Sequence, residues 1–290
     1  MIADKEEAMI RIGTVSSIWR YPVKGMAGES LTRADIGSMG VSGDRVLAVQ
    51  DVARQEIQSC KFRPELLQCR CKAVDNAETV EILFPDGEVK LSSDRDVNDK
   101  ISQLVGHKSK LQSLRPKSDA EFYQRFKRDD HSWLTELKAT FAREPGEPLP
   151  DLDNLPDEMQ TYVSLLGTFF LVSPFHIITT ASLNHMRSIH PGPDWNVERF
   201  RPNLIIETLP EISGLAEQEW LGRSLAIGDV TVKLGEAAPR CGAVVRKQQG
   251  FSEDRSILRS IVRDAHQNLG VYGDILAEGA IHAGDQIYLV

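Results

Sequence analysis

The chain has 290 residues, 41% hydrophobic and 26% charged, which is typical of a soluble globular protein and excludes collagen-like, coiled-coil and disordered classes. Its 42 acidic and 34 basic residues give a formal net charge of −8, and no long lysine and arginine run offsets it, so we expect no nucleic-acid partner. No apolar run approaches the roughly 20 residues that span a bilayer, and the N-terminus lacks a secretory pattern. We therefore expect a cytoplasmic protein without a membrane partner.

The four cysteines are too few and too scattered for a disulfide framework, and we expect free thiols in a reducing compartment. They are Cys60, Cys69, Cys71 and Cys241. None forms a CxxC pair, and their spacing does not fit a plant-type iron–sulfur cluster. Any electrons that the protein uses must therefore come from a separate partner.

The segment from residue 10 to about residue 114 alternates short apolar runs with turn residues, which is typical of a β-rich unit. Strands are predicted at 13–21, 45–50, 68–74, 80–84 and 89–92. The sequence Pro-Asp-Gly-Glu at 85–88 predicts a hairpin between the last two strands. A short helix is expected between residues 94 and 105.

Residues 118–141 differ from this pattern, because apolar side chains recur there near helical spacing and charged ones fill the other positions. This predicts a helical insertion. The proline-rich and glycine-containing stretch 144–150 then breaks any regular element. We place the boundary between two halves of the chain near residue 150.

In the second half a strand is expected at 176–179, followed by a helix that opens at Thr180, whose hydroxyl is the predicted cap. Further strands are predicted at 204–208, 225–227, 230–234 and 286–290. A helix over about 253–268, capped by Ser252 and ending at Gly270, carries its apolar side chains on one face. Short strands without a βαβ rhythm favour barrel-like β units with helices, a mainly β (α+β) fold.

The common zinc, hydrolase and nucleotide-binding motifs are absent from the sequence. The histidines are scattered, and for His176, His185 and His190 a structural role is favoured over a ligand role. Cys69 and Cys71 lie at strand spacing, where packing is the default interpretation of a cysteine.

Cys241 stands out because it follows Arg240 in a turn of small residues, and an adjacent guanidinium favours the thiolate that a soft metal or a sulfur-transfer reaction needs. Two arginines flank a phenylalanine within residues 199–203. They form either a solvated face or a fork that binds an anion. Residues 21–28 run from a strand into a glycine-rich turn with one lysine, a pattern compatible with phosphate binding. From these residues alone, an ordinary turn cysteine and a functional one remain equally open.

Taken in order, these segments resemble the MOSC family, the molybdenum cofactor sulfurase C-terminal domain proteins, with the family's N-terminal β-barrel domain. The matching segments are YPVKG at 21–25, GDR at 43–45, TTASL at 179–183, RFRPN at 199–203, EWLG at 219–222, RC at 240–241 and residues 279–285. The resemblance implies an N-terminal barrel domain at 1–115, a helical insertion and proline-rich linker at 116–160, and a MOSC barrel domain at 161–290.

The resemblance further implies a molybdenum–pterin cofactor (molybdopterin) in a cleft between the two halves. Cys241 matches the position whose sulfur ligates the metal, which makes it the expected metal ligand and catalytic residue. The expected cofactor-binding residues are Lys24, Gly25, Arg45, Thr180, Ser182, Arg201 and Asn203, with Lys24 and Arg45 at the phosphate. Pyridoxal phosphate belongs to the sulfurase half that is sometimes fused to MOSC domains, and we do not expect it here.

Three positions depart from the family pattern. Many relatives have serine at the position of Gly25 and aspartate at that of Thr180, and residues 244–250 replace a Val-Asp-Pro-x-Thr-Gly stretch. The contacts that those relatives make are then lost or replaced by backbone and water.

The expected function is an oxidoreductase that reduces N-hydroxylated or N-oxide compounds, like the mitochondrial amidoxime-reducing relatives, with electrons from a separate ferredoxin-like or flavin reductase. A sulfur or cofactor carrier that uses Cys241 without substrate turnover is the alternative. A third alternative is a module that binds a small anion without turnover, which applies if the departures at Gly25 and Thr180 abolish cofactor binding.

Overall fold

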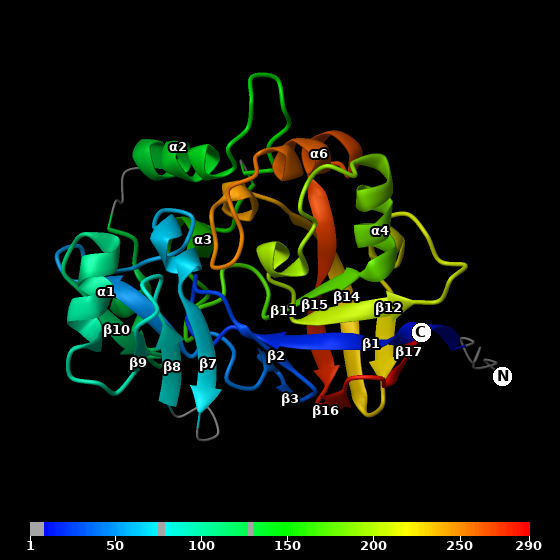
Figure 1. Cartoon of the computed structure of the whole chain (residues 1–290), viewed down its shortest axis with the longest axis horizontal. Coiled ribbons are helices and arrows are strands. Elements are labelled where there is room, and N and C mark those ends of the chain that lie inside the picture. Colours follow the sequence, from blue (N-terminus) through cyan, green and yellow to red (C-terminus); the bar gives the residue numbers. More distant parts are fainter. Residues whose placement is uncertain (1–8, 75–78, 127–129, 153) are drawn as a thin grey trace.

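The computed structural model describes residues 9–74, 79–126, 130–152 and 154–290. Its largest sheet closes into a seven-stranded barrel, β12-β11-β15-β14-β13-β17-β1, because β1 also pairs with β12 (Figure 1). β2 pairs with β1 beside the ring. These strands are β1 (Ile10–Arg20), β2 (Glu29–Leu31), β11 (Phe175–Thr179), β12 (Leu204–Thr208), β13 (Ser224–Ile227), β14 (Val230–Pro239), β15 (Asn268–Ala277) and β17 (Gln286–Leu289).

The barrel core is filled by aliphatic and aromatic side chains that alternate with outward-facing ones along the strands, such as Val230, Val232 and Leu234 of β14. The strands approach so closely at Gly13 that a Cβ there would lie 2.0 Å from the carbonyl oxygen of Glu207. Glycine is therefore required in β1 at the point where it closes the ring against β12.

Strand β1 comes from the first half of the chain and yet lies in the barrel with strands of the second half. It pairs with β12 on one side and with β17 on the other, both antiparallel. Because β1 pairs in this way, the polypeptide leaves the barrel for the N-terminal region directly after residue 20. The domain bounds given above remain a prediction.

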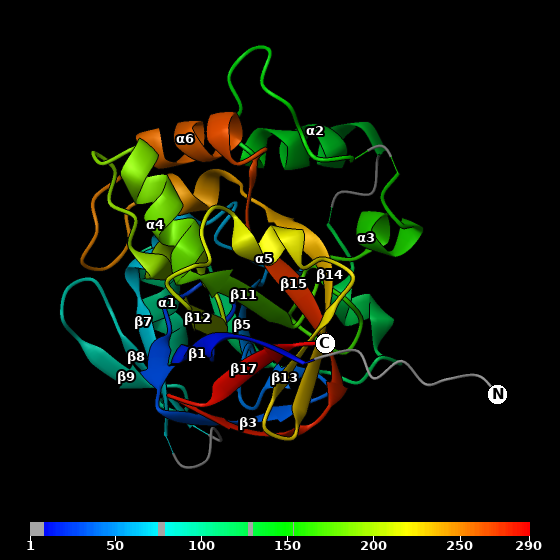
Figure 2. The ribbon, with the colours of Figure 1, turned by 90° about the vertical axis from the view of Figure 1, so that its right-hand side faces the viewer.

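One βαβ unit is present, although the sequence pattern showed no βαβ rhythm. β11 and β12 are parallel neighbours, and α4 (Thr180–Ile189) connects them. α6 (Ser256–Asp264) packs in the same apolar cluster as α4, through Leu183, Met186, Leu258 and Ile261. These helices cover one end of the barrel, next to the short α5 (Ala216–Glu219) (Figure 2).

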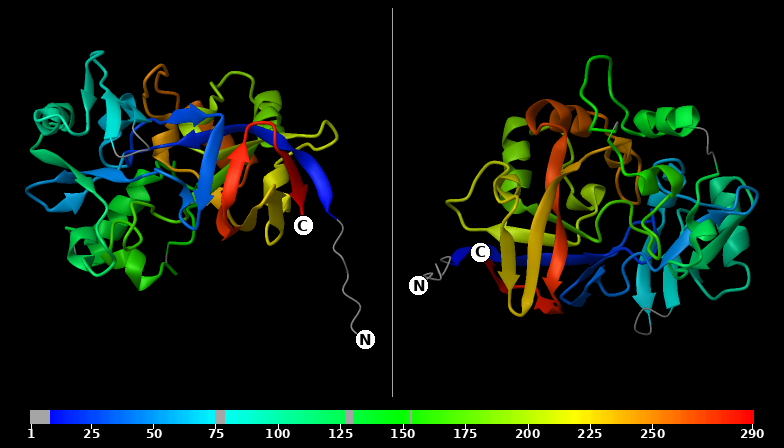
Figure 3. Two further views of the ribbon diagram at one scale, coloured as in Figure 1. Left: turned by 90° about the horizontal axis from the view of Figure 1, so that it is seen from below. Right: turned by 180° about the vertical axis from the view of Figure 1, so that it is seen from behind.

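The N-terminal region contains two three-stranded sheets, β10-β5-β6 and β7-β8-β9, around a second apolar core. The predicted hairpin is confirmed, because β8 and β9 pair antiparallel. Figure 3 shows these sheets beside the barrel. The elements are β5 (Leu47–Asp51), β6 (Glu56–Ile57), η1 (Pro64–Gln68), β7 (Arg70–Val74), β8 (Thr79–Leu83), β9 (Val89–Leu91), α1 (Val97–Val105) and β10 (Ser109–Ser113).

A third small sheet, β16-β3-β4, joins the halves again, because β3 pairs with β16 from the C-terminal part of the chain. Its strands are β3 (Arg33–Gly37), β4 (Gly40–Val41) and β16 (Gly279–His282). The mainly β fold with helices is confirmed. Among the residues that the structure describes, no helix is long and apolar enough to cross a membrane.

The insertion predicted at 118–141 is helical in two separate pieces, η3 (Ala120–Tyr123) and α2 (Asp130–Thr140), and its residues 127–129 lie outside the described ones. η3 packs Phe122 and Tyr123 against Phe169. After α2 the chain continues through α3 (Asp157–Thr161), and η4 (Val197–Phe200) and η5 (Gly242–Val245) lie in the second half.

Three predicted helix ends were wrong, namely the cap of α4 and both ends of α6, for which Ser252 and Gly270 were expected. The cap of α4 is Thr179, whose side-chain oxygen accepts from the amide of Ser182 at 3.1 Å, whereas Thr180 is already in the helix. α6 begins at Ser256 without a side-chain cap and ends at Asp264, and Gly270 lies in β15. A Cβ at Gly270 would lie 2.6 Å from the carbonyl of Ile177, so this glycine serves strand packing rather than helix termination.

Candidate functional site

The YPVKG segment leaves β1 and places Lys24 inside the protein. The Lys24 side chain is 7% exposed, and its Nζ donates to the carbonyl of Phe169 at 2.7 Å. Burial, and next the positive charge of Arg45, lower the pKa of Lys24 to about 7. The ammonium thus lies in a dry, cationic environment with one carbonyl as its acceptor.

Gly25 adopts a φ of +85°, a conformation that side-chain-bearing residues rarely take. A Cβ at this position would lie 3.0 Å from the backbone nitrogen of Cys60. Glycine therefore lets the turn pack directly on Cys60, and it brings that thiol-bearing segment next to Lys24. A side chain such as that of serine would be strained in this backbone.

The GDR segment supplies an acid and a base that face the same turn. Asp44 is 5% exposed, accepts from the amide of Tyr21 at 2.6 Å and from the Asn203 side chain at 2.9 Å, and pairs with Arg45. Burial raises the pKa of Asp44 above its usual value, against the opposing charge of Arg45. The Arg45 guanidinium also lies over the rings of Tyr21 and Phe170, at 5.3 and 5.0 Å from their centroids.

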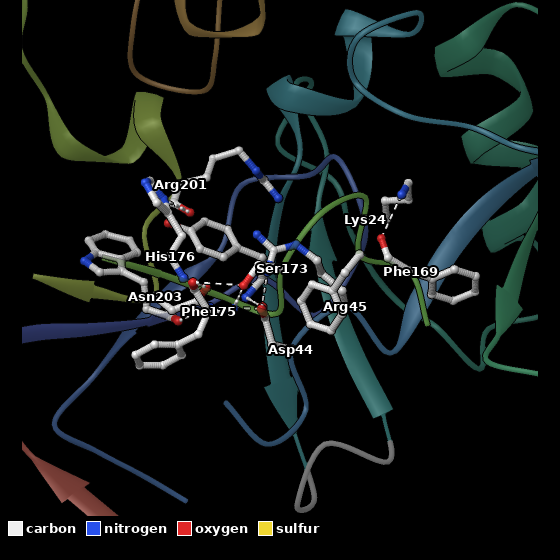
Figure 4. A network of polar contacts seen from close by, with 12 residues as sticks. Lys24, Asp44, Arg45, Phe169, Ser173, Phe175, His176, Arg201 and Asn203 are labelled. Atoms are coloured by element: carbon white, nitrogen blue, oxygen red, sulfur yellow. Dashed lines mark hydrogen bonds and ion pairs between the residues drawn. The ribbon is translucent and has the colours of Figure 1, made fainter. Parts of the chain in front are cut away.

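The RFRPN segment brings a second arginine and an amide to the same place. Arg201 has a φ of +55°, donates to the carbonyl of Met26, and lies over the Tyr21 ring at 4.3 Å. Asn203 is fully buried, donates to the carbonyl of Trp19 at 3.2 Å, and accepts from the amide of His176 at 3.2 Å. Figure 4 shows Arg45 between Lys24 and the group formed by Arg201 and His176.

Cys241 directly follows β14 and Arg240, and it is half-buried at the start of η5. Arg240 is buried, and its guanidinium donates to the carbonyls of Leu269 and Phe200, at 2.8 and 3.2 Å, and to Nε2 of His176. Burial, and then the charge of Arg240, hold the pKa of His176 well below its usual value. His176 is therefore neutral, accepts at Nε2, and donates from Nδ1 to the carbonyl of Arg201 at 3.4 Å.

Family models match both parts of the chain. The model of the MOSC domain matches residues 167–288, and that of the MOSC N-terminal beta barrel domain matches residues 12–129. The chain belongs to the MOSC family. MOSC domains are associated with the molybdenum cofactor, so this is a molybdenum-cofactor-related protein.

The family assignment agrees with curated relatives of low identity. Mitochondrial amidoxime reducing component 2 of Bos taurus and that of Rattus norvegicus are each 23% identical over 96% of this chain and 83% of the relative. Mitochondrial amidoxime-reducing component 1 of Mus musculus is 23% identical over 97% of this chain and 83% of its own. Among solved structures, the YuaD protein of Bacillus subtilis aligns over 97% of this chain and 98% of its own, at 10% identity and a TM-score of 0.43.

The structure thus brings five of the site residues expected of a MOSC protein together, and it places two others in a different set of contacts. Lys24, Gly25, Arg45, Arg201 and Asn203 surround the Tyr21 turn. We call Lys24, Arg45 and Arg201 the cationic cluster. The cofactor-binding role of all these residues remains a prediction.

The hydroxyls of Thr180 and Ser182 bond to other elements of the fold, that of Thr180 to β12 and that of Ser182 to α5. Thr180 accepts from the amide of Thr208 at 3.1 Å. Ser182 is fully buried and donates to the Glu217 carboxylate, which also accepts from Thr179 at 2.5 Å. Burial raises the pKa of Glu217. We call Thr179, Ser182 and Glu217 the hydroxyl cluster.

Two residues near the site were not selected from the sequence. His176, for which the sequence favours a structural role, joins Arg240 to Arg201. Cys60, which the sequence marks only as a free thiol, packs on Gly25. Burial raises the pKa of the Cys60 thiol, while the charge of Arg201 opposes that rise. No local sequence signal marks either residue, because their neighbours come from distant parts of the chain.

Within the described ranges, no three histidine, cysteine, aspartate or glutamate side chains gather as a group that could hold a metal ion. A surface cavity of about 470 Å³ lies away from the cationic cluster, and no expected site residue lines it. Its lining residues are Arg187, Pro191, Pro193, Asp194, Trp195 and Asn196. The site is therefore defined by the side chains around Tyr21 and Cys241.

Proposed function

We propose that the protein binds the molybdenum cofactor at the cationic cluster, with Cys241 as the protein ligand of the metal, and that it reduces N-hydroxylated or N-oxide compounds. Electrons come from a separate donor of the ferredoxin or flavin reductase type. The observation that carries this proposal is the gathering of Lys24, Arg45 and Arg201 around one turn in a chain whose net charge is −8.

The cationic cluster fits a phosphate group because its positive charge exceeds the negative charge that the chain places there. Asp44 pairs with Arg45, whereas Lys24 and Arg201 donate to main-chain carbonyls. A phosphate would provide the missing anion, form charge-assisted hydrogen bonds, and reverse the loss of basicity at Lys24. The Tyr21 ring holds Arg45 and Arg201 in place, and Asn203 holds Asp44, which pairs with Arg45.

Cys241 fits the metal end of such a group. Its thiol is half-buried, and a thiolate is the soft ligand that molybdenum prefers over the hard carboxylates and carbonyls that surround the cluster. When bound, the cofactor supplies a metal that exchanges two electrons and takes up an oxygen atom. The chain itself positions Cys241 through Arg240, whose guanidinium is fixed by two carbonyls and His176.

Cys69 and Cys71 do not compete for this role. Cys69 and Cys71 are fully buried in the N-terminal core, where burial raises the pKa of Cys69 to about 12 and that of Cys71 well above its usual value. A donor protein with its own redox group is part of the proposal. The cytoplasmic location also stays a prediction.

The test measures molybdenum and pterin per chain in protein from a host that makes the cofactor. We expect near-stoichiometric metal in the wild type, loss of metal from Cys241→Ala, and retention in Cys71→Ala, which removes a core thiol as the matched control. Reduction of an N-oxide with a chemical electron donor should follow the metal content.

Equal metal in the wild type and in Cys241→Ala would contradict the ligand assignment. Absence of both metal and pterin, in a host shown to load a related enzyme, would contradict cofactor binding and favour a sulfur carrier that uses Cys241. Metal-loaded protein that reduces no N-oxide or N-hydroxylated compound would contradict the reductase activity alone.

A further inference from the structure

Residues 140–149, which are the last residue of α2 and the nine residues after it, lie directly on the turn that carries Cys241, and we call them the strap. A Cβ on Gly242 would be 3.0 Å from both the Ala142 side chain and the carbonyl oxygen of Thr140. Only glycine after the cysteine leaves room for this contact. In both Figure 1 and Figure 2, α2 and the segment after it lie beside α6, on the side of the barrel where η5 begins.

Two arginines anchor the strap. Arg143 donates to the carbonyl of Arg240 at 3.0 Å and to the Gln267 side chain at 3.2 Å. Arg259 of α6 donates to the carbonyl of Ala142 and pairs with Glu147. The strap is thus bound to the residue that precedes Cys241 and to the helix behind it.

Phe141 is the apolar side chain that the strap turns inward, and it is 5% exposed. The ammonium of Lys61 and the guanidinium of Arg143 lie 5.4 and 5.5 Å from the centre of its ring. Lys61 follows Cys60, whose backbone packs on Gly25. One aromatic ring therefore stands between two cations that are far apart in the sequence, and the backbone next to it contacts the turn of Cys241.

Neither cation is neutralised by an ion pair in the part of the chain that the structure describes. The Arg143 donors go to the carbonyls of Phe141, Pro148 and Arg240 and to an amide. Lys61 is half-buried, and its charge helps to lower the pKa of Lys24, after burial and Arg45. A phosphate on the cationic cluster would leave Lys61 and Arg143 as additional positive charge on the strap side of Cys241.

We infer that Lys61 and Arg143, which the buried Phe141 ring holds beside the turn of Cys241, select a substrate that carries a negative charge, such as a carboxylate. This inference rests on the proposed function for the position of the reacting group at Cys241. The two cations attract an anion through a medium of low dielectric. Lys61 is the specificity-determining residue, because Arg143 also anchors the strap.

The experiment compares two ligands of the same shape that differ in charge, pyridine-3-carboxylate N-oxide and pyridine-3-carboxamide N-oxide. Their dissociation constants are measured by calorimetry on the cofactor-loaded protein at low salt, without an electron donor, so that binding is read without turnover. We expect the carboxylate to bind about fivefold to tenfold more tightly than the carboxamide, from a charge contact on a partly buried surface. Added salt should reduce the ratio.

Lys61→Gln should bring the ratio of the two dissociation constants close to one, and Lys61→Glu should reverse it. The Lys61 ammonium makes no hydrogen bond in the described structure, and thermal unfolding checks that both variants fold. Lys110→Gln is the matched control, because it removes the same charge from an exposed position of β10 and should leave the ratio at the wild-type value.

Equal affinity for the two ligands, a ratio that Lys61→Gln does not change, or binding of neither ligand would each overturn the inference. Failure of the proposed function gives a different result. In that case the loaded protein reduces neither N-oxide when electrons are supplied, while the carboxylate still binds more tightly in the absence of a donor.

Discussion

The hydroxyl cluster is fully buried, whereas in the cationic cluster Lys24 is buried and Arg45 and Arg201 are half-buried, and the balance of charge in the two clusters also differs. In the hydroxyl cluster, one oxygen of the Glu217 carboxylate accepts from both Thr179 and Ser182, while its other oxygen is buried without a hydrogen-bond partner in the described structure. In the cationic cluster, Lys24 and Arg201 have carbonyls and an aromatic face but no carboxylate of their own. The first stabilises the fold without a ligand, whereas the second leaves positive charge that an anion would neutralise.

The largest effect that separates the clusters is expected at Glu217. Glu217→Ala leaves the hydroxyls of Thr179 and Ser182 without their acceptor in a fully buried place, which should lower the free energy of unfolding by about 3 kcal/mol. Glu217→Gln keeps an oxygen acceptor and should cost about 1 kcal/mol. Urea unfolding measures both. A loss in Glu217→Gln as large as that in Glu217→Ala would show that the negative charge, rather than the acceptor, matters.

Lys24 should show the opposite behaviour, because its burial as a cation costs stability in the absence of a ligand. The folded pKa is about 7 and the unfolded value about 10.5, so the unfolded chain binds more protons between these values, and stability should rise with pH through that window. Below pH 7 both states are charged and the penalty is complete. Lys24→Met should therefore stabilise cofactor-free protein by about 2 kcal/mol at pH 6 and abolish the rise.

The measurement for Lys24 is urea unfolding of protein from a host without the cofactor, at several pH values from 6 to 9. Lys110→Met, at an exposed position of β10, is the control that should follow the wild-type profile. A Lys24→Met variant that is less stable than the wild type at pH 6 would mean that the bond to the Phe169 carbonyl outweighs the cost of burial. Such a result would remove the charge excess on which the phosphate assignment depends.

The smallest effect is expected at Gly25, where the turn of the cationic cluster packs on Cys60. Gly25→Ser should cost about 2 kcal/mol, from the left-handed backbone and from a Cβ that is 3.0 Å from the Cys60 nitrogen. Gly87→Ser is a matched control, since Gly87 has a φ of +87° and no neighbour within 4 Å, and it should cost about 1 kcal/mol. Thermal unfolding compares the two, and equal losses would show that the Cys60 contact is not tight.

Local sequence patterns predicted most strands and the hairpin at 85–88, because alternation and turn residues act between near neighbours. They misplaced the cap of α4, where Thr179 and Thr180 are both good capping residues and the backbone geometry decides between them. They missed the parallel pairing of β11 and β12, because one βαβ unit among many antiparallel strands leaves no periodic signal. They also missed His176, whose position on an apolar strand resembles that of any packed side chain.

The sequence by itself determined the mainly β fold with helices, the family, and the identity of the residues around Tyr21 and Cys241, because these depend on residue types at set positions along the chain. Only the tertiary structure decided which of them meet. The closure of the barrel by β1 places Tyr21 and Arg45 beside Arg201, while the buried contact of α4 with α5 directs Ser182 to Glu217. The strap over Cys241 is likewise a tertiary feature, since Phe141, Lys61 and Gly242 come from three distant segments that only packing brings together.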